Sequence, residues 1–177
     1  MIFLRHPRPH VAPGVCYGRL DLGLGPRAAA EITAALAATP RAQAVLTSPA
    51  GRCRPLAEAL AARDGVAAVV EPDLWELDFG TWEGRAWDAI DRAESDPWAA
   101  DPWRVAPPGG ETFAALHARV AGVLARAPAG AVIVTHAGPI RAARMILTGA
   151  RFGAVFAKRV PYAVPVVLSR VKGILSV

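Results

Sequence analysis

The sequence predicts an α/β fold, a three-layer αβα sandwich built on a mixed, mostly parallel sheet. Short apolar runs alternate with longer helix-forming segments along the chain, and this alternation is typical of parallel sheets covered by helices. The length of 177 residues and the 53% share of hydrophobic residues suffice for one core without disulfides or a structural metal. We therefore expect residues 1–177 to form a single domain.

Three strands are predicted in the first half of the chain, at residues 2–4, 45–47 and 67–71. The helix between the first two extends over residues 25–38, with Pro26 at the first helical position, where its missing amide hydrogen costs nothing. A second helix follows Ser48 and extends to residue 63. Because Pro55 would cost about 3 kcal/mol in a helix interior, the regular part of this helix is expected to begin nearer Arg52 than Ser48.

The second half begins after a middle section rich in Trp, Asp and Glu, at the chain-breaking run of residues 107–110. A Pro-Pro-Gly-Gly run of this kind is typical of a loop. The elements predicted beyond it are a helix at 112–126, the clearest strand at 131–135, a helix at 138–147, and strands near 163–168 and 173–177.

Composition excludes several classes of protein. No stretch approaches the roughly 20 apolar residues of a membrane span, and the opening residues lack the pattern of a signal peptide. Cys16 and Cys53 are too few for a disulfide framework, and neither lies in a zinc-binding pair. We therefore expect a cytoplasmic protein that binds no membrane and no metal; its oligomeric state is open, with a homodimer as one option.

The net charge of +5 rests on 20 basic residues, of which 18 are arginines scattered along the whole chain. Arginine's rigid fork suits planar anions such as phosphate. A nucleic-acid-binding protein would gather such residues on one face with aromatic residues among them, and no such clustering is visible. A small anionic substrate is the favoured partner, and a basic RNA-binding module, which a steep salt dependence of binding would reveal, is the alternative.

Two histidines and two arginines follow three of the predicted strands. The first strand leads into Arg5 and His6, the second leads to Arg52 within one helical turn, and the strand at 131–135 leads into His136. In open α/β sheets, ligands bind beyond the carboxyl ends of the strands. These four side chains are therefore expected to share one pocket, although a single histidine after a strand is more often structural. His10 and His117 carry no such signal.

This set of residues suits phosphoryl transfer without a metal or another cofactor. A neutral imidazole is a nucleophile toward phosphorus, and two arginines can bind the non-bridging oxygens. The second histidine, if protonated, would add a charged donor, and helix N-termini after Ser48 and His136 would direct amides at the same anion. A carboxylic acid is still needed to protonate the leaving oxygen and then to activate water.

Five segments resemble, in order, the motifs of the histidine phosphatase superfamily, which includes phosphoglycerate mutases and many small phosphatases. Leu4-Arg5-His6 resembles its Arg-His-Gly signature. Residues 48–54 are similar to its segment for the second phosphate-binding arginine, and residues 74–84 to its segment for the proton donor. Residues 108–112 are similar to its loop before the next helix, and residues 134–141 to its second-histidine motif. The resemblance spans residues 2 to 147 and implies a phosphoglycerate mutase-like fold.

The resemblance also implies roles for individual residues. His6 becomes the phosphorylated nucleophile, Glu76 the acid and base, and the phosphate pocket is formed by Arg5, Arg52, His136 and the backbone of Ala137. From the residues alone, Asp78 and Glu83 compete with Glu76 for the acid role, and only the family pattern selects Glu76. Glu83 is interpreted as a structural partner for an arginine.

The loop after His6 departs from the family pattern. Pro7 stands where the family has glycine, Arg8 follows it, and the chain contains no asparagine to take the family's usual substrate contact. Arg8 becomes either a further anion contact or an exposed side chain. Residues 15–21, with Tyr17 and Gly18 as expected substrate contacts, resemble a loop of α-ribazole phosphatase-like members.

The activity that this resemblance implies is hydrolysis of a small phosphomonoester, with α-ribazole 5′-phosphate of cobalamin biosynthesis as one candidate. Phosphoglycerate mutase-type phosphoryl transfer is an alternative, but the long insertions of such mutases have little room in 177 residues. A domain that binds a phosphorylated ligand without cleaving it is the other alternative, and the intact set of five residues argues against it.

Overall fold

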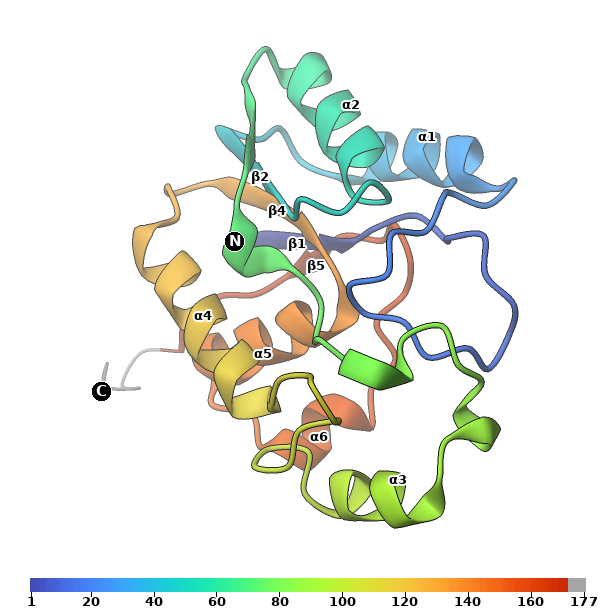
Figure 1. The fold of residues 1–177 in the computed structure, drawn as a ribbon. Helices are drawn as coiled ribbons and strands as arrows, with labels where there is room; N and C mark the ends of the chain where they lie inside the picture. Colours follow the sequence, from blue (N-terminus) through green and yellow to red (C-terminus); the bar gives the residue numbers. More distant parts are fainter. Residues whose placement is uncertain (172–177) are drawn as a thin grey trace.

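A five-stranded sheet forms the centre of the computed structural model, which describes residues 1–171 (Figure 1). The strand order is β3-β2-β4-β1-β5. The strands are β1 (Ile2–Arg5), β2 (Ala44–Thr47), β3 (Ala68–Val70), β4 (Ala131–Thr135) and β5 (Val166–Val167). The first four are parallel, and β5 pairs with β1 in the antiparallel direction. The predicted mixed, mostly parallel sheet is thus confirmed.

Helices cover both faces of this sheet. They are α1 (Ala28–Ala38), α2 (Arg54–Asp64), α3 (Arg92–Ala100), α4 (Phe113–Arg126), α5 (Ala137–Thr148) and α6 (Phe152–Phe156). Alternate residues of a strand point to opposite faces, so Val132 and Val134 pack in the cluster with α1 and α2, whereas Ile133 packs with α4 and α5. Figure 1 shows the two helix pairs on opposite sides of the strands, which confirms the three layers.

The helix starts follow the local sequence in two of three cases. Thr112 caps α4, because its hydroxyl accepts a hydrogen bond from the Ala115 amide at 3.1 Å. Pro55 lies in the first turn of α2, as expected, so that helix begins at Arg54. The prediction for Pro26 was wrong: the Ala28 amide bonds to the Gly25 carbonyl in a turn, and α1 begins only after it.

Two regions differ from the sequence expectations. The strand expected near residues 163–168 is reduced to Val166–Val167, because Ala163 has a φ of 51° and Pro165 lacks an amide to pair. Helices α3 and α6 were not predicted, and three short 3₁₀ turns occupy residues 72–74, 80–82 and 87–89. The last predicted strand, at 173–177, lies outside the described residues.

The topology brings three strand ends together. In the order β2-β4-β1, the carboxyl ends of parallel neighbours meet at one edge of the sheet. The His6 amide donates to the Thr135 carbonyl at 2.8 Å, and the Ser48 amide donates to the Val134 carbonyl at 3.0 Å. His6, Ser48 and His136 are therefore placed side by side. No helix within residues 1–171 is long and apolar enough to cross a membrane.

Candidate functional site

His6 lies directly after β1 and is almost completely buried, with 1% of its surface exposed. Its Nδ1 lies 2.7 Å from the Pro7 carbonyl oxygen. A carbonyl only accepts, so Nδ1 carries the hydrogen and Nε2 keeps its lone pair. Burial lowers the pKa of His6 well below its ordinary value, and the nearby Arg52 and Arg5 charges lower it further. The imidazole is therefore neutral at neutral pH.

The Arg5 guanidinium is held by groups from the C-terminal part of the chain. It donates to the Val160 carbonyl at 3.1 Å and to the Tyr162 hydroxyl at 3.0 Å, and it lies 3.8 Å over the Tyr162 ring. Tyr17 is a third contact, at 3.4 Å. The buried Nε of Arg5 has no partner among the described residues. Sequence reasoning missed Tyr162, which is 157 residues away from Arg5 in the chain.

Arg52 is fully buried in the turn before α2. Its guanidinium donates to the Leu20 carbonyl at 2.7 Å, to the Gly18 carbonyl, and to Nδ1 of His136 at 3.1 Å. Its Nε, like that of Arg5, is buried without a partner in residues 1–171. The guanidiniums of Arg5 and Arg52 both lie against Tyr17, and two guanidiniums in one pocket suit a multiply charged oxyanion.

His136 is the N-cap residue of α5 and is completely buried. Nδ1 accepts from Arg52, which leaves Nε2–H to donate to the Ser48 hydroxyl at 2.8 Å. The centroid of its ring lies 5.1 Å from that of His6, and the Trp75 ring is nearly parallel to it at 6.1 Å. The two strand-end histidines therefore meet, as expected.

The charged donor that a protonated His136 would supply is not present in this arrangement. Burial lowers the pKa of His136 well below its ordinary value, and the His6, Arg52 and Arg5 charges add to this effect. Helix α2 begins at Arg54, nearer Arg52 than Ser48 as expected, and Ser48 instead holds His136. The first turn of α5 does begin at Ala137, so its amides face this edge of the sheet.

Glu76 reaches the start of α5. Its carboxylate accepts from the Gly138 amide at 3.0 Å and from the Leu77 amide at 3.0 Å. A side chain at position 138 would place its Cβ 2.1 Å from the Glu76 carboxylate, so only glycine allows this approach. The acidic group is thus positioned at the start of α5, two residues after His136.

The carboxylates of Asp78 and Glu83 bind groups other than the start of α5. Asp78 accepts from the Gly80 amide at 2.9 Å and lies 3.5 Å from Arg19. Glu83 accepts from the amides of residues 18–20 and of Phe79. Glu83 is therefore structural as expected, but its predicted arginine partner is wrong: its partners are the backbone amides of the loop whose carbonyls orient Arg52.

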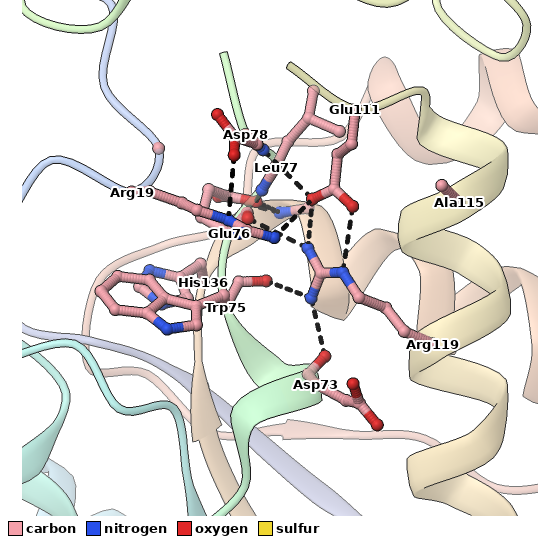
Figure 2. A network of polar contacts seen from close by, with 12 residues as sticks. Arg19, Asp73, Trp75, Glu76, Leu77, Asp78, Glu111, Ala115, Arg119 and His136 are labelled. Carbon is pink, nitrogen blue, oxygen red and sulfur yellow. Dashed lines mark hydrogen bonds and ion pairs between the residues drawn. The ribbon is translucent and has the colours of Figure 1, made fainter. Parts of the chain in front are cut away.

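A second network holds the segment that carries Glu76 (Figure 2). Arg119 on α4 donates to the carbonyls of Asp73, Trp75 and Glu76 at 2.7, 2.6 and 3.0 Å. Glu111 lies 2.5 Å from the same guanidinium and also accepts from the Asp78 amide. Sequence reasoning missed Arg119; the available signal was a cation near the buried positions Leu116 and Val120 of an amphipathic helix.

The expected substrate contacts lie around Arg5. The Tyr17 hydroxyl bonds to that of Tyr162 at 3.0 Å, and burial, followed by this bond, raises the pKa of Tyr17 to about 12. Arg8 lies 4.9 Å over the Tyr162 ring, is half exposed, and pairs with Glu31 at 3.7 Å. The amide and carbonyl of Gly18 are both used within the protein. Substrate contact by these three residues stays a prediction.

Neither a metal site nor a thiolate is present among the described residues. Within residues 1–171, no group of three or more His, Cys, Asp or Glu side chains could hold a metal ion. Cys16 and Cys53 are both buried and free. Burial raises the pKa of Cys53 to about 12, so this thiol next to His136 stays protonated.

Comparison with known proteins identifies the family. The family model described as the Histidine phosphatase superfamily (branch 1) matches residues 1–172. This chain belongs to the histidine phosphatase superfamily. The match extends beyond the five motifs and includes the segment that carries Tyr162.

Individual proteins are also similar to this chain. The bifunctional protein Rv2228c of Mycobacterium tuberculosis is 32% identical over 155 residues, which is 80% of this chain and 42% of that protein. The chain thus spans less than half the length of that relative. TTHB049 from Thermus thermophilus is 29% identical in a solved structure, with a TM-score of 0.70 over 82% of this chain and 83% of that one.

A solved α-ribazole phosphatase shares the fold. The protein from Shigella flexneri superposes with a TM-score of 0.83 over 93% of this chain and 87% of that chain. The sequences are 22% identical, so the likeness concerns the fold alone. The phosphoglycerate mutase-like architecture expected for a histidine phosphatase is thereby confirmed.

Proposed function

We propose that this histidine phosphatase hydrolyses a small phosphomonoester through a phosphohistidine on Nε2 of His6. The observation that carries the proposal is the state of His6: Nδ1–H is tied to the Pro7 carbonyl, and burial keeps the ring neutral. A neutral imidazole with a free Nε2 lone pair is the form that attacks phosphorus. The adjacent guanidiniums of Arg5 and Arg52 bind the non-bridging oxygens during transfer.

The reaction proceeds in two balanced steps. Nε2 of His6 forms a bond to phosphorus while the bond to the leaving oxygen breaks, and Glu76 donates its proton to that oxygen. Glu76, now a carboxylate, takes a proton from water, whose oxygen attacks phosphorus as the N–P bond breaks. His136 and the Ala137 amide complete the phosphate pocket and stabilise the charge on the transferred group.

α-Ribazole 5′-phosphate is the candidate substrate within this proposal. Support comes from the resemblance of residues 15–21 to the loop of α-ribazole phosphatase-like members, and in this structure that loop contacts both Arg52 and Arg5 through Gly18 and Tyr17. The testing experiment measures phosphate release from a panel that includes α-ribazole 5′-phosphate and 3-phosphoglycerate. Release without transfer to a second alcohol is expected; isomerisation of 3-phosphoglycerate would instead support the mutase alternative.

Chelators are expected to leave the activity unchanged. The charge that a metal would supply to the transferred phosphoryl group comes in this proposal from Arg5 and Arg52. The measurement is phosphate release before and after incubation with EDTA and removal of the chelator complex. A loss of activity that a divalent ion restores would contradict the mechanism.

Arg119→Lys is expected to loosen the Glu76 segment. A lysine point charge cannot bond three carbonyls and Glu111 together as the guanidinium does. We expect the free energy of unfolding to fall by about 1–3 kcal/mol. The kcat/KM should fall more for alkyl phosphates, which need the Glu76 proton in the phosphorylation of His6, than for p-nitrophenyl phosphate.

The matched control for this variant is Arg126→Lys, on the same helix. Arg126 pairs with Glu71 and Asp73 at the surface, so its replacement should leave activity and unfolding unchanged. If Arg119→Lys lowers the kcat/KM for both kinds of ester equally, Arg119 does not act through the proton that Glu76 donates.

A further inference from the structure

A cavity of about 220 Å³ opens next to Glu76. Half of the residues that line it are aromatic, namely Phe79, Trp87, Trp98, Phe113 and Phe156. Whole ligand pockets usually measure about 300–1,000 Å³. The cavity is therefore of a size for one part of a substrate, such as a single ring with a short chain.

The aromatic wall is internally packed. The Trp87 and Trp98 rings stack with centroids 5.7 Å apart, and Phe79 meets both of them edge to face at 5.5 and 5.9 Å. Such contacts stabilise ring pairs beyond the burial of their area. A flat apolar group would therefore meet a surface that is already ordered.

Two hydrogen-bond donors in this wall have no partner in the described part of the chain. They are Nε1 of Trp98 and Nε of Arg141, both buried. Trp82, in contrast, donates to Glu94 at 2.9 Å. Buried donors without partners are rare and cost free energy, so an acceptor supplied by a ligand is a physical explanation for this pair.

Arg141 forms no salt bridge within residues 1–171, and Glu76 is the carboxylate whose charge acts on it. Its guanidinium lies 4.7 Å over the Phe156 ring, and none of the described carboxylates forms a salt bridge with it. Gly138 and Arg141 are three residues apart on α5 and so share a face, which places Arg141 next to Glu76. A charged, incompletely bonded guanidinium in an apolar cavity favours a carboxylate.

We propose that this cavity binds the alcohol part of the substrate and selects phosphomonoesters that carry an aromatic ring and a carboxylate remote from the phosphate. The inference rests on the proposed function, in which Glu76 protonates the leaving oxygen. The alcohol part of the substrate then starts next to Glu76, which lines the cavity. The ring packs against Trp87 and Trp98. The carboxylate accepts from Arg141 and from Nε1 of Trp98.

Binding of a product analogue tests the cavity without turnover. The probes are 3-(4-hydroxyphenyl)propanoate and its uncharged counterpart 4-ethylphenol, measured by calorimetry and by quenching of tryptophan fluorescence. We expect the carboxylate to bind about 10–100-fold more tightly, as hydrogen bonds to charged groups imply. Arg141→Met should remove this preference, whereas Arg144→Met, on the same helix and outside the cavity wall, should keep it.

Trp98→Phe is a second test variant, and it remains informative if Arg141→Met does not fold. It keeps a ring in the wall and removes only the unpaired donor, so the preference for the carboxylate should fall by about 3–10-fold. Equal binding of the two probes to the wild-type protein would overturn the inference, whatever the variants do.

Turnover of the matching esters separates this inference from the proposed function. The pair is 3-(4-phosphooxyphenyl)propanoate and 4-ethylphenyl phosphate, whose phenols are similar leaving groups. We expect a higher kcat/KM for the first, lost in Arg141→Met. An equal fall for both esters would overturn the selective role of Arg141. Selective probe binding with no turnover of any phosphomonoester would overturn the proposed function instead.

Discussion

Replacing His6 with alanine is expected to abolish phosphomonoester turnover, with a loss in kcat of about 10³-fold or more, the scale on which loss of a covalent nucleophile acts. No other described imidazole at the strand ends offers a free Nε2, because that of His136 is bonded to Ser48. The measurement is phosphate release from p-nitrophenyl phosphate, together with trapping of acid-labile, base-stable phosphate on the wild-type protein and its absence on the variant.

Whether the His6→Ala variant folds is a separate question. From the sequence, a histidine after a strand should contribute little to packing, but His6 is buried and its ring lies within 5.6 Å of both His136 and Tyr162. His6→Gln, which keeps most of the volume, is therefore measured beside His6→Ala. Circular dichroism reports whether each variant is folded.

The control for the nucleophile is His10→Ala. His10 is exposed in the loop four residues further along the chain and should be dispensable. Turnover by folded His6→Gln at a rate comparable to that of the wild type would remove His6 from the nucleophile role.

Glu76→Gln is expected to slow alkyl phosphates by about 10²–10⁴-fold, the usual contribution of a general acid. p-Nitrophenyl phosphate should be slowed far less in the phosphorylation of His6, because its phenolate leaves with little help. The amide oxygen of glutamine can still accept from Gly138, so the local packing is retained. The measurement is kcat/KM on both kinds of ester, since this constant reports the first irreversible step.

Two comparisons show whether a selective loss in Glu76→Gln reflects the loss of the general acid. Arg52→Ala should slow both esters, because it removes charge stabilisation that every phosphoryl transfer needs. Asp78→Asn and Glu83→Gln should show no selective loss on alkyl phosphates, because those carboxylates are bonded to backbone amides away from α5. A selective loss in either of them, with an equal loss on both esters in Glu76→Gln, would move the acid role to that residue.

Several features of this member of the histidine phosphatase superfamily could be predicted because their cause is local. The run at residues 131–135 is apolar on both faces, as a central strand must be, and it forms β4 between β2 and β1. The spacing of Phe113, Leu116, Val120 and Val123 produces the buried face of α4. The order of the strands then brings His6 and His136 together, as the sequence indicated.

The middle section could not be predicted, because its order comes from contacts between distant side chains. Helix α3 contains Pro97 and has no fully buried residue, so its periodicity is weak. Trp98 is instead held by Phe79 and Trp82, and Trp82 bonds to Glu94. A local pattern does not reveal such a cluster, which also forms the wall of the cavity next to Glu76.

The amino-acid sequence by itself determined the α/β class, the strand-end histidines and arginines, and the resemblance that named Glu76. Only the tertiary structure distinguished the three carboxylates by position, because Glu76 reaches the start of α5 at Gly138, 62 residues away in the chain. It also decided that His136 is neutral, since burial and the Arg52 bond act across the fold. Periodicity and spacing record what neighbours in the chain do, whereas hydrogen-bond partners and desolvation depend on which distant residues the fold brings into contact.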